Sequence, residues 1–127
     1  MTEKEILELC DKVREASFAL HRFLRHGHLE KVYENGLANR LRKQNVKVQQ
    51  QFPLEVLDED GTVLGSFLAD LFVEDCLVVE LKACSALAPD HEGQLFGYLR
   101  ASRNEHGMLI NFGGPKLQVR KYVLNND

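Results

Sequence analysis

Residues 67–82 decide the fold, and they run Phe67-Leu68-Ala69-Asp70-Leu71-Phe72-Val73-Glu74-Asp75-Cys76-Leu77-Val78-Val79-Glu80-Leu81-Lys82. Two apolar runs flank the acidic pair Glu74-Asp75, which is typical of two strands joined by a short turn. The second run is made almost entirely of Leu, Val and Ala, so we expect it to lie in the middle of a sheet. Charged residues on a central strand are costly unless they are paired or bind something. The charged residues of this hairpin therefore need a partner.

The length of the turn predicts which residues of the hairpin face each other. If residues 74–76 form the connection, Val73 pairs with Leu77, and three steps further Asp70 lies opposite Glu80. Opposed residues point to the same face, with Cβ atoms about 4.5–5.5 Å apart. A register one residue off would move Asp70 to the other face.

Two opposed carboxylates repel each other, and a divalent cation between them would remove the repulsion. Lys82 lies one side-chain step beyond Glu80, close enough to touch a phosphate or a water molecule. The alternative is a buried salt bridge from Lys82 to Glu80 or Asp70 that has no function. One lysine cannot neutralise two acids, so a cation site is the favoured interpretation.

Outside the hairpin, the periodicity of apolar residues predicts the remaining elements. Thr2 and Glu5 form a capping-box pattern before the first helix, and Pro53 indicates an edge position or a bulge in the first strand. We expect an α/β domain with a mixed sheet and the order α-α-β-β-β-α-β-β. The expected helices span about 3–25, 29–43 and 89–102, and the expected strands 46–56, 63–73, 76–83, 107–112 and 117–124.

Composition is that of an ordinary globular protein. The chain has 127 residues, which fits one domain over 1–127, and a formal net charge of −3, which argues against a strongly basic nucleic-acid coat. Residues 51–100 carry two basic and ten acidic residues, between mildly basic flanks. This is compatible with a solvated acidic surface or with a cation site whose flanks meet phosphates. The three cysteines match no disulfide or zinc pattern. The sequence also shows no apolar run of membrane-spanning length and no secretory signal. These features predict a cytoplasmic location.

Three motifs together resemble a known family. Asp70 followed by Glu80-Leu81-Lys82 is similar to the signature of the PD-(D/E)XK nuclease superfamily, although Ala69 stands where the name has proline. Gln94-Leu95-Phe96-Gly97-Tyr98 resembles the QhxxY motif of its RecB-like and lambda-exonuclease-like branches. Gly27-His28-Leu29-Glu30-Lys31-Val32-Tyr33 matches GxxExxY, the pattern of a family of small, mostly bacterial proteins in that superfamily.

The resemblance implies a restriction-endonuclease-like core and hydrolysis of phosphodiester bonds, with DNA as the expected partner. Asp70, Glu80 and Glu30 would hold Mg²⁺ or Mn²⁺, and Lys82 would position water or neutralise the phosphate. Gln94 and Tyr98 would orient the site or contact the nucleic acid. Without the resemblance, Glu30 would be interpreted as a solvated helix acid, and Tyr98 as a packing residue beside a surface Gln94.

Two other functions stay open from the sequence. The chain could keep the nuclease fold but bind nucleic acid or a protein without cutting, because a fold does not fix a function. It could also be an interaction protein, such as a homodimer formed through its last strand or first helix. The candidates for phosphate contacts, most of which are expected to be plain surface charge, are Arg14, Arg22, Arg25, Arg40, Arg42, Lys43, Lys116, Arg120 and Lys121.

Overall fold

The computed structural model describes residues 1–124, and the order of its elements is the predicted one. The elements are α1 (Glu3–Leu24), α2 (Glu30–Lys43), β1 (Val48–Leu57), β2 (Val63–Val73), β3 (Leu77–Lys82), α3 (Pro89–Ser102), β4 (His106–Asn111) and β5 (Gln118–Val123). None of the helices within residues 1–124 is both long and apolar enough to cross a membrane.

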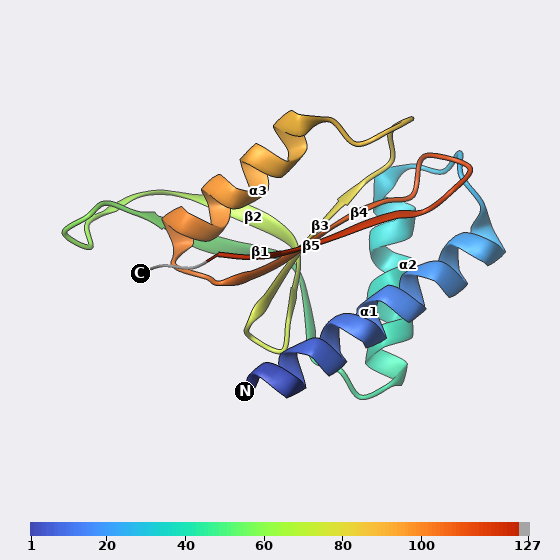
Figure 1. Cartoon of the computed structure of the whole chain (residues 1–127), viewed down its shortest axis with the longest axis horizontal. Helices are drawn as coiled ribbons and strands as arrows, with labels where there is room; N and C mark the ends of the chain where they lie inside the picture. Colours follow the sequence, from blue (N-terminus) through green and yellow to red (C-terminus); the bar gives the residue numbers. More distant parts are fainter. Residues whose placement is uncertain (125–127) are drawn as a thin grey trace.

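The strands form one mixed sheet in the order β1-β2-β3-β4-β5. β3 and β4 run parallel, and every other neighbouring pair is antiparallel. Helices α1 and α2 cover one face of the sheet and α3 covers the other (Figure 1). β3 is central, as predicted, and Pro53 lies in β1 at an edge, where its missing N–H breaks no ladder.

β3 is buried on both faces because its residues alternate between the two helical layers. Leu77, Val79 and Leu81 pack in the core under α1 and α2, whereas Val78 packs in the core under α3. By the same alternation Glu80 and Lys82 leave the strand on the side of Val78. The two layers thus bury an apolar strand that carries two charged side chains at its carboxyl end.

The β2–β3 hairpin has the predicted register, with Val73 opposite Leu77. Glu74 and Asp75 both have positive φ, at 50° and 55°, as a tight hairpin turn with right-handed twist requires. The N–H of Cys76 donates to the carbonyl of Val73 within this turn, so β3 begins at Leu77 and not at the predicted Cys76.

The start of β1 also differs from the prediction. The N–H of Val46 donates to the carbonyl of Leu41 at the end of α2, so this residue belongs to the helix terminus and the strand begins at Val48. A period of two in the sequence cannot reveal that the first residue of the pattern is used to close a preceding helix.

The segment after β3 is held against the end of β4. The side-chain amide of the fully buried Asn111 accepts from the N–H of Cys84 and donates to its carbonyl, both at 3.0 Å. Gly113 lies so close that a Cβ there would be 2.2 Å from the carbonyl oxygen of Cys84. These contacts fix the backbone two residues beyond Lys82.

Gly113→Ala should therefore destabilise the protein by about 1–3 kcal/mol, because backbone and not a flexible side chain would have to move. Urea unfolding followed by circular dichroism measures the change. Gly93→Ala in α3 is the matched control: a Cβ there has nothing within 4 Å, so it should be neutral or stabilise by up to about 1 kcal/mol. Equal unfolding midpoints for wild type and Gly113→Ala would contradict this account of the turn.

Candidate functional site

The site lies where β2 and β3 separate. Their ladder runs from Val73–Leu77 to Leu71–Val79, so one further step in the same register brings Asp70 to the level of Glu80. At that level a side chain joins the two strands, because Oδ2 of Asp70 accepts a hydrogen bond from the N–H of Leu81 at 2.8 Å. This bond holds the Asp70 carboxylate against the end of β3.

Glu80 is buried, with 9% of its surface exposed, and its Oε1 has no hydrogen-bond partner among the residues that the structure describes. Burial first, and then the neighbouring Asp70 carboxylate, raise the pKa of Glu80 to about 9, whereas Lys82 acts in the opposite direction. A buried acceptor without a partner is costly and rare in folded proteins. Glu80 therefore has an unused oxygen next to a second carboxylate.

Lys82 is half-buried at the end of β3, and in the described part of the chain its ammonium forms no ion pair. The structural salt bridge that the sequence left open is thus not made. A lysine beside two carboxylates with its donors uncommitted can contact an added anion or a water molecule.

Glu30 is the first residue of α2, and its side chain faces solvent. The turn before it depends on Gly27, whose φ of +109° suits glycine, and on the hydroxyl of Tyr33, which donates to the carbonyl of Arg25 at 2.5 Å. Partial burial, and then the Asp70 carboxylate, raise the pKa of Glu30, while Lys82 opposes them. Glu30 is therefore close enough to Asp70 and Lys82 for both to affect its pKa.

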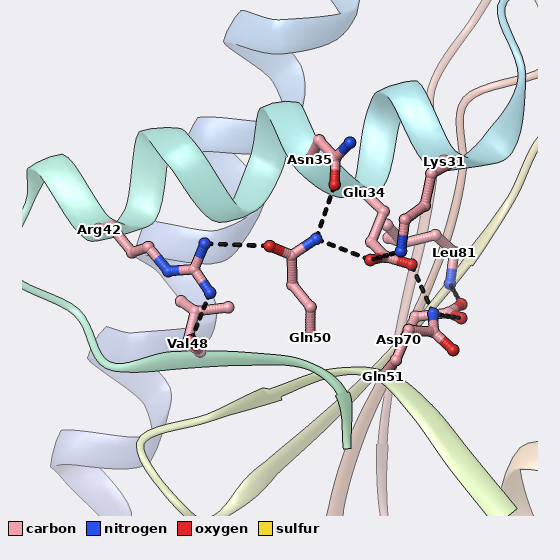
Figure 2. Close-up of polar contacts among 9 residues, drawn as sticks. All are labelled: Lys31, Glu34, Asn35, Arg42, Val48, Gln50, Gln51, Asp70 and Leu81. Atoms are coloured by element: carbon pink, nitrogen blue, oxygen red, sulfur yellow. Dashed lines mark hydrogen bonds and ion pairs between the residues drawn. The ribbon is translucent and has the colours of Figure 1, made fainter.

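A second carboxylate on α2, Glu34, is tied to the site by hydrogen bonds that the sequence analysis did not predict (Figure 2). Nε2 of Gln51 donates to Glu34 at 2.6 Å and to Asp70 at 3.2 Å, so one amide bridges the two acids. Lys31 and Gln50 also donate to Glu34, each at 2.7 Å. Burial alone would raise the pKa of Glu34, but these hydrogen bonds outweigh it and lower the pKa below its usual value.

Gln51 reaches both acids from a strained backbone. Its φ is +49° in the middle of β1, a left-handed conformation that is uncommon for a residue other than glycine. Such strain persists where the surrounding structure requires it, and it is frequent at functional sites. The three consecutive glutamines 49–51 in a strand were the available signal, because amide side chains in a half-buried strand need partners.

The chain resembles known proteins in sequence and in fold. Residues 7–122 match the PD-(D/E)XK nuclease superfamily. The chain belongs to this superfamily. A solved structure described as "Crystal structure of SSO0001" has a similar fold, with a TM-score of 0.59 and 18% sequence identity over 76% of this chain and 50% of that one. The chain thus spans half the length of that protein, and the likeness concerns the fold alone. No curated protein matches the sequence.

Gln94 and Tyr98, suggested by the superfamily's helical motif, lie together on α3. The amide of Gln94 donates to the hydroxyl of Tyr98 at 2.8 Å, and the Tyr98 ring stacks on Phe67 of β2 with centroids 4.0 Å apart. Within residues 1–124, no hydrogen bond joins either residue to Asp70, Glu80 or Lys82. Tyr98 thus packs α3 against β2, the strand that carries Asp70, and Gln94 contacts this packing through the Tyr98 hydroxyl.

Members of this superfamily are typically metal-dependent. Among the described residues, no group of three or more His, Cys, Asp or Glu side chains is arranged to hold a metal. Mg²⁺ is usually held by only one or two carboxylates and keeps several waters. Asp70 with the unpartnered Oε1 of Glu80 fits that requirement.

Proposed function

We propose that this protein is a metal-dependent nuclease that hydrolyses phosphodiester bonds, with DNA as the expected substrate. The observation that carries the proposal is the buried, unpartnered oxygen of Glu80 beside Asp70, at the end of a strand that also presents the uncommitted Lys82. Membership of the PD-(D/E)XK nuclease superfamily supports the same chemistry.

Asp70 and Glu80 would hold Mg²⁺ or Mn²⁺ directly, and Glu30, at the solvent side, would act on the ion through one of its waters. Oxygen ligands of this kind suit these hard cations. When bound, such an ion lowers the pKa of a water molecule and stabilises the charge that develops on the phosphate. The chain's own part is to keep the carboxylates in position: Leu81 and Gln51 both donate to Asp70, which limits its rotation.

The remaining roles follow from charge and place. Lys82 would neutralise a phosphate oxygen or orient the attacking water, because its donors are free and the site is only half-exposed. Glu80 is buried, so water screens it little, which strengthens every electrostatic interaction at that carboxylate. Gln94 and Tyr98 would act indirectly, through the packing of α3 against Phe67, or by contact with the nucleic acid.

Within the superfamily we place the chain in the GxxExxY group. The support is structural as well as sequential: Gly27 allows the turn, Tyr33 ties it to α2, and Glu30 is thereby presented at the helix start. The three fixed residues of the motif, Gly27, Glu30 and Tyr33, would thus together orient the Glu30 carboxylate toward the site.

The assay that tests this function offers single- and double-stranded DNA and RNA to the purified protein with Mg²⁺ or Mn²⁺. We expect cleavage of at least one substrate with the ion and none after chelation by EDTA. Cleavage unaffected by EDTA would contradict a metal-dependent mechanism. Oligonucleotide binding with no cleavage under any ion condition would instead support the catalytically silent binding module.

A further inference from the structure

A second concave site lies between α1 and the turn that joins β4 to β5. It is a pocket of about 560 Å³ lined by residues of α1, of the segment after β3, and of the turn and β5. Its walls include Arg14 and Phe18 from α1, Ser85 and Ala86 after β3, and residues 114–120. Nothing in the proposed chemistry uses this pocket.

Positive charge is concentrated on the pocket. Arg14, Lys116 and Arg120 line it, and among residues 1–124 no Asp or Glu does. None of the three forms an ion pair within residues 1–124. Glu92, which lines a neighbouring small pocket together with Arg120, accepts a hydrogen bond from the hydroxyl of Tyr122. In a protein with a net charge of −3, a surface of three uncompensated cations is complementary to an anion.

The remaining wall is apolar, and it is suited to a flat ring. This apolar wall is formed by Phe18, Pro115, Leu117 and Val119. The guanidinium of Arg14 lies over the Phe18 ring, 5.5 Å from its centroid. Aromatic rings and guanidinium planes are the surfaces on which unpaired bases stack in single-strand-binding proteins. A plain phosphate would use the cations but leave this wall empty.

The pocket and the carboxylate site open at the same end of the sheet. β3 and β4 are parallel, so the segments that follow Lys82 and Asn111 leave from the same edge, as Figure 1 shows. Ser85 is the third residue after Lys82, which limits the distance between them to at most about 11 Å. Three stacked nucleotides of a strand span about 10 Å. A strand that passes around this end of the sheet, from the α3 side where Lys82 leaves β3 to the α1 side where the pocket lies, could therefore occupy both places.

We propose that this pocket binds an unpaired nucleotide of the substrate strand, with its phosphate among Arg14, Lys116 and Arg120 and its base against Phe18. The proposal rests on the proposed nuclease function, because it assumes a nucleic-acid substrate. It adds that this substrate has a single-stranded segment a few nucleotides away from the bond that is cut.

The test measures binding without catalysis. A short fluorescein-labelled oligothymidylate is titrated with protein in EDTA and followed by fluorescence anisotropy. Replacing Arg14, Lys116 and Arg120 together by Ser should weaken binding about tenfold or more. The matched control replaces the exposed Lys4, Lys12 and Arg100 by Ser, which removes the same charge away from the pocket, and should weaken binding much less.

A second variant tests the base. Phe18→Leu keeps an apolar side chain and should weaken binding of oligothymidylate about fivefold or more, while an abasic oligonucleotide of equal length is bound as by wild type. Equal binding by the pocket variant and its charge control would overturn the proposal, as would equal effects of Phe18→Leu on both probes. The test separates this proposal from the proposed function. If wild type cleaves DNA but the pocket variants bind as their controls do, only the pocket proposal is refuted. If binding depends on the pocket but no cleavage occurs, only the nuclease proposal is refuted.

Discussion

Lys82→Met is expected to lower the rate of phosphodiester cleavage by about 10²–10³-fold or more, the range seen when one preorganised electrostatic group is removed from an active site. Methionine keeps the apolar stem of the side chain and removes the charge. Lys82 is half-buried and forms no ion pair in the described part of the chain, so the substitution breaks no salt bridge and should leave the fold intact. Single-turnover rates with the best substrate measure the effect.

Asp70→Asn should give a loss of similar or larger size, because it removes one of two carboxylates while its remaining oxygen can still accept from Leu81. The matched control is Lys12→Met, at an exposed position of α1 outside the site. Circular dichroism and urea unfolding confirm that each variant folds. Cleavage at the wild-type rate by both site variants would refute the assigned roles of Asp70 and Lys82.

The sequence predicted the fold well because its signals were local. The alternation of apolar residues located the strands, and the three-residue connection 74–76 set the β2–β3 register, which the structure confirms at Val73 and Leu77. Asp70 and Glu80 can lie opposite each other only in that register. Counting residues along the two strands was therefore enough to predict the central part of the candidate site.

The rest of the site depends on tertiary contacts that leave no local pattern. Glu34 lies one helical turn beyond Glu30, and only the packing of α2 over β1 shows that it is the buried acid held by Gln51. The pocket next to the site combines Arg14 with residues about a hundred positions later in the chain. Residue type identifies such groups as candidates, but only the structure brings them together.

The state of Glu80 also needs the structure, because the raised pKa comes from burial. Its folded pKa of about 9 lies above the ordinary value of 4.5, so between these two pH values the folded protein holds a proton that the unfolded chain releases. Stability is then fully present below about pH 4.5 and is lost as pH rises toward 9. One such group contributes a slope of at most about 1.4 kcal/mol per pH unit.

Glu80→Gln removes this titration while keeping the size and a neutral side chain, so the metal-free variant should resemble wild type at low pH and be more stable by on the order of a few kcal/mol near pH 9. Urea unfolding in EDTA across pH 5–9 measures the difference, which cancels titrations common to both proteins, including that of Glu30. The exposed Glu15→Gln serves as control and should follow the wild-type slope. Millimolar Mg²⁺ should narrow the difference near neutral pH by stabilising wild type more than Glu80→Gln, since ligand binding to the folded state raises stability. Parallel pH profiles for wild type and Glu80→Gln would mean that Glu80 is ionised in the metal-free fold, and the argument from its buried, unpartnered oxygen would fail.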